Sequence, residues 1–452
     1  MEPMMFLNYV DISVFEKIYN DVKNSPPDQY AQLREQLPVN RFYYNPPLGW
    51  HHTKAEVERR VYVDGQMPYL VLDTGSVCRY KCEMCYTYSN ESNRKGKYPS
   101  PLSLEQKKHI LSVAKERLGT ETFIIEGAGE PVLNTDTIPM LEHAIKLGLR
   151  AIVFNSGIKI EKLLPLIIES GGSVGFKFHG LEPHMTPDIY NRILGQPDAW
   201  DYMLQAIDII FHDKKLNTPV FDKDGKLLAM TRVVLDNYMN PEGKAAYLST
   251  LYWAYQNNCA IALTGDMPTK KDLKSLDYMS AEEFTSTVLQ ARYFLWVMGW
   301  MPPGRAHLVS ECEQKYGLRI TDGMVGPDGK VAGNVFGCVG EVEPFMDLRF
   351  MYGEELTKGL ETAWARRRQW VPNGCQPRFN ALSSLGMNPD AAGCLFTDPV
   401  RVQQPRTDTP FETSLLEFLA SYAPGKVEYT EVPRPLTTIR RNAQATTPTT
   451  SV

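Results

Sequence analysis

Between residues 69 and 265, short apolar runs rich in β-branched residues alternate with amphipathic stretches. This rhythm predicts six buried strands separated by helices. The strands are expected at 69–73, 122–126, 151–155, 174–178, 229–235 and 260–263. Helices are expected at about 103–118, 160–169, 200–213 and 241–257. Six consecutive strand-then-helix units specify a parallel sheet with right-handed crossovers, an α/β fold.

Other segments lie on both sides of this repeat. An N-terminal capping segment is expected at 1–66 and the repeat itself at 67–265. A helical bridge at 266–305 is expected to lead into a small C-terminal α+β module at 306–405. A short helix with a disordered tail is expected at 406–452. Capping boxes open the first helix of the repeat, at Ser103 with Gln106, and the bridge helix, at Ser280 with Glu283. A Pro-Asp-Gly turn at 327–329 predicts a hairpin in the C-terminal module.

Composition narrows the functional classes. The 452 residues, 43% of them apolar, suffice for two or three domains with a large core. A net charge of −5 argues against a dedicated nucleic-acid binder. The one dense basic run, Arg366-Arg367-Arg368, is interpreted as a solvated helix face.

The compartment is inferred from what the sequence does not contain. The first residues lack the basic and apolar regions of a signal peptide, and no apolar stretch is long enough to span a bilayer. A cytoplasmic protein without a membrane partner is therefore expected. In a reducing cytosol, eight cysteines indicate metal or cluster ligands and not disulfides.

Three cysteines stand just after the first predicted strand, in the spacing Cys-x3-Cys-x2-Cys. Cys78, Cys82 and Cys85 supply three thiolates within eight residues. An iron–sulfur cube offers four irons and a zinc ion takes four donors, so either group keeps one open position. A zinc knuckle completed by Asp, Glu or a remote His is the alternative, and it would make the chain a non-catalytic binding module.

This triplet resembles that of the radical S-adenosylmethionine (SAM) superfamily. The resemblance implies a partial (β/α)6 TIM-like barrel, a [4Fe-4S] cluster on the triplet and SAM chelated at the open iron. It also implies reductive cleavage of SAM to a 5′-deoxyadenosyl radical that abstracts hydrogen from substrate, with an electron donor such as flavodoxin or ferredoxin.

A Gly-rich turn follows the second predicted strand. Gly127-Ala128-Gly129-Glu130-Pro131 resembles the family's Gly-Gly-Glu-Pro element, which binds the amino group of SAM. Lys177, between Phe176 and Phe178, either points into the barrel or snorkels at the surface. The expected cofactor contacts are Gly127, Gly129, Glu130, Asn155, Ser156, Lys177 and Arg232.

Further polar residues end strands four and five of the prediction. Chemistry in such barrels occurs at the carboxyl ends of the strands. His179, Asp236 and Tyr238 are therefore the candidate catalytic residues, with His179 or Asp236 as acid or base.

Four cysteines of the C-terminal module, two of them flanking the hairpin, resemble the SPASM or twitch auxiliary-cluster domains. They are Cys312, Cys338, Cys375 and Cys394, and four thiolates saturate one auxiliary [4Fe-4S] cluster. A zinc ribbon-like site or unrelated buried thiols are the alternatives. Cys259 is expected to be a buried, inert thiol.

The substrate is the least determined feature. Stretches from 180 to 200, Gly-Leu-Glu-Pro and Ile-Leu-Gly-x-Pro-x-Ala-Trp, resemble the small-molecule branch, whose substrates are sugars or aminocyclitols of natural-product pathways. No separate leader-peptide-binding domain is evident before Tyr69. A small molecule is therefore favoured, and a peptide or protein substrate is the alternative.

Overall fold

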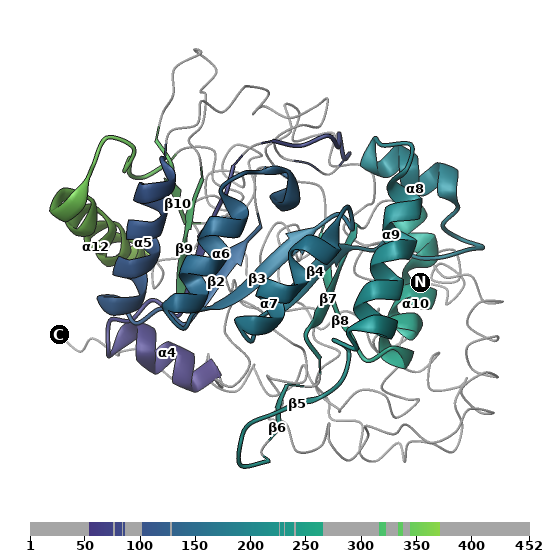
Figure 1. The fold of residues 1–452 in the computed structure, drawn as a ribbon, viewed down its shortest axis with the longest axis horizontal. Coiled ribbons are helices and arrows are strands. Elements are labelled where there is room, and N and C mark those ends of the chain that lie inside the picture. Colours follow the sequence, from purple (N-terminus) through teal and green to yellow (C-terminus); the bar gives the residue numbers. More distant parts are fainter. Residues whose placement is uncertain are drawn as a thin grey trace, which may run out of the picture.

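The computed structural model (Figure 1) describes a mixed α/β protein around one large sheet. The described residues are 54–75, 77–83, 85, 102–126, 129–225, 227–229, 231–238, 241–264, 316–321, 333–337 and 344–370.

Six parallel strands form the centre of this sheet, in the order that the sequence predicts. They are β1 (Tyr69–Leu72), β2 (Thr122–Ile125), β3 (Arg150–Asn155), β4 (Ser173–Lys177), β7 (Val233–Tyr238) and β8 (Ala260–Thr264). Every neighbouring pair among them is parallel. The residues of β1, β2, β3, β4 and β7 are almost all buried, as is usual for strands covered on both faces. The α/β class with a partial-barrel order is thus confirmed.

Helices connect these strands in the expected alternation. They are α5 (Leu104–Glu116), α6 (Thr137–Lys146), α7 (Leu164–Glu169), α8 (Pro187–Leu194), α9 (Ala199–Ile207) and α10 (Pro241–Gln256), with a π-helical turn at Asp208–Asp213. The capping box of α5 is confirmed: the Ser103 side chain accepts from the Gln106 amide, and the Gln106 side chain accepts from the Ser103 amide.

The fifth predicted strand, 229–235, is placed too early. The structure has a short hairpin of β5 (Val220–Phe221) and β6 (Leu227–Ala229), and the sheet strand β7 begins only at Val233. Only Thr231 and Arg232 interrupt the apolar residues from β6 to β7, so periodicity alone did not separate the two strands. The Thr231 hydroxyl accepts from the Val233 amide at 3.1 Å and starts the strand.

Strand register decides which side chains share a face of the sheet. Paired residues of adjacent parallel strands point to the same side, and the sides alternate along each strand. Phe176 and Phe178 face the helices, where they contact Phe211 and Trp253. Lys177 and its register partner Asp236 therefore face the barrel interior.

A strand from the second half of the chain extends this sheet. β9 (Gly317–Ile320) runs parallel to β1, and β10 (Val335–Phe336) pairs antiparallel with β9. The antiparallel pairing expected of a hairpin is present between β9 and β10, which lie in the same sheet as the barrel strands (Figure 1). The predicted Pro-Asp-Gly turn at 327–329 lies outside the described residues. Register pairs Arg319 with Val71, so Arg319 shares the inner face.

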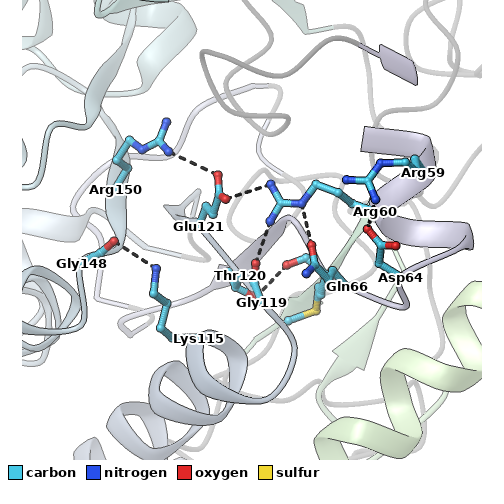
Figure 2. A network of polar contacts seen from close by, with 11 residues as sticks. Arg59, Arg60, Asp64, Gln66, Lys115, Gly119, Thr120, Glu121, Gly148 and Arg150 are labelled. Atoms are coloured by element: carbon cyan, nitrogen blue, oxygen red, sulfur yellow. Dashed lines mark hydrogen bonds and ion pairs between the residues drawn. The ribbon is translucent and has the colours of Figure 1, made fainter. Parts of the chain in front are cut away.

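Two helices from outside the six-strand repeat lie on the side of the sheet that carries β9 and β10 (Figure 1). In α4 (Lys54–Tyr62), Arg60 binds Glu121, which also binds Arg150 (Figure 2). In α12 (Gly353–Trp370), Arg367 is buried and donates to the carbonyl of Gly337 at 3.1 Å.

The interpretation of 366–368 as a solvated face is therefore wrong for two of its residues. Arg367 is buried, and Arg368 is half-buried and donates to the Val61 carbonyl at 3.3 Å. Arg366 alone is exposed. The helix packs against the rest of the chain on the side that carries Arg367, which the charge run by itself did not indicate.

Candidate functional site

The cysteine triplet lies on a loop that leaves β1 and rests on the end of α8. Amides of Lys81 and Glu83 donate to the carbonyls of Leu194 and Ile193, at 3.2 and 2.9 Å. Gly195 ends α8 with a positive φ of 59°, and a Cβ there would stand 2.8 Å from the Lys81 carbonyl oxygen. Only glycine combines this backbone conformation with this close approach.

The three cysteines of this loop form no disulfide with one another and are partly buried. The Cys85 amide donates to the Cys82 carbonyl at 3.0 Å, and the Cys78 sulfur accepts from the Tyr80 amide at 3.4 Å. Burial raises the pKa of Cys78 to about 12 and that of Cys82 well above its ordinary value, and neighbouring thiolates add to both shifts.

Buried thiols that resist ionisation become thiolates when they bind a metal cation, because the positive charge offsets the cost of burying a negative one. The chemistry of Cys78, Cys82 and Cys85 therefore suits a metal cluster, and their role as its ligands stays a prediction. Within the described ranges, no three His, Cys, Asp or Glu side chains are gathered so as to hold a metal ion.

Glu130 is the centre of a buried hydrogen-bonded unit. Its carboxylate accepts from the side-chain amide of Asn155 and from the backbone amide of Ser156, the latter at 3.1 Å. Burial raises the pKa of Glu130 to about 7, although the bonds from Ser156 oppose the shift. Three of the predicted cofactor contacts are thus brought together. Gly129 immediately precedes them, and Gly127 lies outside the described residues.

Asn134 joins the cysteine loop to the Glu130 loop, and sequence analysis missed it. Its amide group donates to the carbonyls of Val77 and Glu130, at 3.2 and 2.7 Å, and its oxygen accepts from the Val77 amide at 2.9 Å. A Cβ on Gly75 would stand 2.3 Å from that oxygen, so a side chain at 75 would displace Asn134. An Asn three residues after Gly-Glu-Pro was the available signal.

Lys177 and Asp236 form an ion pair on the inner face of the sheet, between β4 and β7. Burial acts to lower the pKa of Lys177, but the Asp236 carboxylate outweighs it and the pKa lies above its ordinary value. Of the two alternatives that the sequence left for Lys177, the inward one is confirmed.

His179 follows Lys177 and is fully buried. Its Nδ1 accepts from the Tyr238 amide at 2.9 Å, which puts the single ring proton of the neutral form on Nε2. Burial and the nearby Lys177 lower its pKa to about 3, so the imidazole is neutral at pH 7. His179, Asp236 and Tyr238 thus lie together.

Arg232 does not lie with the other predicted cofactor contacts. It precedes β7, at the amino end of the strand, and donates to the carbonyls of Gly172, Ile167 and Ile168 around the end of α7. The structure contradicts its expected contact with the cofactor carboxylate. The error follows from the misplaced fifth strand: the prediction of a strand at 229–235 put Arg232 in its middle, whereas in the structure Arg232 precedes the first residue of β7.

A second buried ionic group on the inner face was also missed. Arg319 of β9 contacts Glu126 at 3.1 Å and Asp73 at 3.8 Å, and its side chain is 1% exposed. A charged residue inside the apolar run 317–320 was the available signal.

The remaining cysteines are only partly covered by the structure. The expected auxiliary ligands Cys312, Cys338, Cys375 and Cys394 lie outside the described residues. Cys259 is partly buried, and burial raises the pKa of its thiol.

The family model of the Radical SAM superfamily matches residues 72–218. No curated protein matches the chain. Solved structures similar to it include SuiB of Streptococcus suis bound to precursor peptide SuiA, with 12% identity, 68% of this chain and 69% of that chain covered, and a TM-score of 0.39. Native anSMEcpe with bound AdoMet has 14% identity and a TM-score of 0.43, and the match covers 78% of this chain and 98% of that chain. Methylornithine synthase (PylB) has 14% identity and a TM-score of 0.34, and the match covers 58% of this chain and 75% of that chain.

The matched segment contains the cysteine triplet, the Gly-Ala-Gly-Glu-Pro element and the unit of Glu130, Asn155 and Ser156. No helix among the described residues has the length and apolar character needed to cross a bilayer. Residues 72–218 are thus a radical SAM domain, and the protein that carries it is a radical SAM enzyme, a family whose cofactors are a [4Fe-4S] cluster and S-adenosylmethionine.

Proposed function

We propose that this enzyme abstracts hydrogen from an unactivated C–H bond of a small polar molecule of the sugar or aminocyclitol type. When bound, the cluster supplies the electron that cleaves SAM and so provides the hydrogen-abstracting radical. The residues of the chain bind the cofactor, orient the substrate and accept or donate its proton.

The Lys177–Asp236 pair is the observation that carries this proposal. It lies on the inner face of the sheet, at the strand ends where barrel enzymes bind substrates. Fixed charges at such a place favour a ligand rich in hydroxyl or amino groups over an apolar one. A peptide would need an extended groove or a strand edge for pairing.

The proposed roles follow from position and bonding. Cys78, Cys82 and Cys85 hold the cluster, and Glu130 binds the SAM ammonium in a pocket shared with Gly127, Gly129, Asn155 and Ser156. Asp236 is the proposed proton acceptor for the substrate, because it is a carboxylate on the inner face in the carboxyl-terminal half of β7, the end at which barrel enzymes bind their substrates. Tyr238 is proposed to contact substrate, and His179 to hold the end of β7 through its bond to the Tyr238 amide.

Further parts of the proposal concern the second half of the chain and the cellular context. Cys312, Cys338, Cys375 and Cys394 are proposed to bind one auxiliary [4Fe-4S] cluster in a SPASM- or twitch-like module. The enzyme is proposed to act in the cytoplasm, in natural-product biosynthesis, with flavodoxin or ferredoxin as the electron donor. These assignments rest on the residue pattern.

Isotope transfer tests the substrate class. Reconstituted enzyme is incubated anaerobically with SAM, a reductant and either sugars and aminocyclitols or peptides, each deuterated at defined carbons. Deuterium in the 5′-deoxyadenosine recovered from a sugar or aminocyclitol incubation is the expected result, read by mass spectrometry. Transfer from a peptide alone would overturn the small-molecule proposal and leave the family assignment intact.

A further inference from the structure

Two glutamates flank strand β2, and each is bound by a buried arginine from a distant segment. Glu121, before the strand, is 3.0 Å from Arg60 of α4 (Figure 2). Glu126, after the strand, is 3.1 Å from Arg319 of β9. The arginine side chains are 9% and 1% exposed. The two pairs are alike in chemistry but lie at opposite ends of the barrel.

Arg319 contacts the starting points of both loops that carry the cofactor site. One guanidinium nitrogen donates to Glu126, from which the chain continues to Glu130. Another lies 3.8 Å from Asp73, from which the chain continues to Cys78. The two loops also bond each other, since the Glu130 amide donates to the Val77 carbonyl at 2.9 Å.

Charge balance on the inner face depends on this guanidinium. Asp73 is fully buried, and the side chain of Glu126 is about one-third exposed. Burial raises the pKa of Glu126, Arg319 and Lys177 oppose the shift, and Asp236 adds to it. Without Arg319, two carboxylates would face each other at the ends of β1 and β2, and their repulsion would act on the strand ends that aim both loops.

We propose that Arg319 is a positioning residue for the SAM site, acting through Asp73 and Glu126 on the cysteine loop and the Glu130 loop. It lies outside residues 72–218, so a strand from the second half of the chain completes the cofactor site of the radical SAM domain. The inference rests on the family's cofactors and not on the proposed substrate.

The test compares Arg319→Met with Arg60→Met, its matched control at the other end of β2. Three quantities are measured on reconstituted full-length enzyme: the midpoint of thermal unfolding, the Kd for SAM, and the electron paramagnetic resonance spectrum of the reduced cluster with and without SAM. Both variants should unfold at lower temperature and keep their iron. Only Arg319→Met should raise the Kd for SAM, by about 10- to 100-fold, which is the usual effect of changing a group that supports a cofactor ligand. Only this variant should also weaken the spectral change that follows SAM addition.

Two further variants keep the proposal falsifiable. Arg319→Lys retains the charge but cannot bridge two carboxylates as a guanidinium does, so its Kd should lie between those of wild type and Arg319→Met. If Arg319→Met does not fold, Glu126→Gln removes one bridged charge at constant shape, and it should raise the Kd with a nearly unchanged unfolding midpoint. Equal SAM affinity in the Arg319 and Arg60 variants, or wild-type affinity in Glu126→Gln, would overturn the proposal.

Discussion

Two hydrogen bonds join the side-chain amide of Asn134 to the backbone of Val77, in the way that a residue of a neighbouring strand would pair with it. The Val77 amide donates to Asn134 Oδ1 at 2.9 Å, and Asn134 Nδ2 donates to the Val77 carbonyl at 3.2 Å. Because the same Nδ2 also donates to the Glu130 carbonyl, one amide group sets the separation of the cysteine loop and the Glu130 loop.

Replacing Asn134 by alanine should therefore reduce both stability and cofactor binding. Loss of these buried bonds is expected to cost about 2–3 kcal/mol of unfolding free energy, measured by chemical denaturation. The Kd for SAM should rise as well. Asn217→Ala is the control, because Asn217 also donates to a loop carbonyl, that of Asn257, away from the cysteine loop. Loss of SAM affinity in both variants alike would show that Asn134 has no special part in the site.

Iron counting tests the assignment of the cysteines. Wild-type enzyme should hold about eight irons after reconstitution, from two cubes, and the triple change of Cys78, Cys82 and Cys85 to Ala about four. That variant should form no 5′-deoxyadenosine. Cys259→Ser should leave both quantities unchanged. One zinc with only four irons in the wild type would support a zinc ribbon-like second site, and SAM cleavage at the wild-type rate by the triple variant would remove the triplet from the mechanism.

The Lys177–Asp236 pair should matter far more than an ion pair at the surface. Lys177→Met leaves the Asp236 carboxylate, 11% exposed, without this cation, and a loss of about 3 kcal/mol in unfolding free energy is expected. Adding Asp236→Asn should recover much of the loss, because the uncompensated charge is removed. Lys108→Met breaks the pair with Glu105, which is 82% exposed, and should cost less than about 0.5 kcal/mol. Equal losses from Lys177→Met and Lys108→Met would contradict the inward placement.

His179 should make stability depend on pH in the acid range. Its pKa in the folded protein, about 3, lies below the ordinary value of 6.5, so between these values the unfolded chain binds more protons. Stability contributed by neutral His179 is therefore fully present above pH 6.5 and falls as the pH decreases below it, by up to about 1.4 kcal/mol per pH unit.

The matched variant is His179→Asn, whose side-chain oxygen can still accept from the Tyr238 amide. Unfolding free energies of the two proteins, measured from about pH 7 to about pH 5, should converge as the pH falls. Groups that titrate equally in both proteins cancel in the difference. A constant difference over this range would mean that His179 is not held neutral by burial.

Much of the fold was predictable because the local periodicity of apolar residues indicates where strands and helices lie. Five of the six strands lie within two residues of their predicted ends, and Ser103 with Gln106 begins α5 as the capping box indicated. The exception, β7, shows the limit of that signal. Only Thr231 and Arg232 interrupt the apolar residues from the hairpin to β7 there, and the bond from the Val233 amide to Thr231 marks the start of the strand.

The cysteine triplet and the Glu130 element stand out in the sequence because each is a short motif of neighbouring residues that resembles a motif of the radical SAM superfamily. What the sequence by itself determined is thus the α/β order and the places of these two motifs, and their roles at the cofactor stay predictions. Tertiary structure decided the rest: that Lys177 meets Asp236, that Arg232 lies at the far end of β7, and that Arg319 reaches Glu126 across 193 residues of chain. Such contacts depend on strand order and register, which bring together side chains that no local pattern relates.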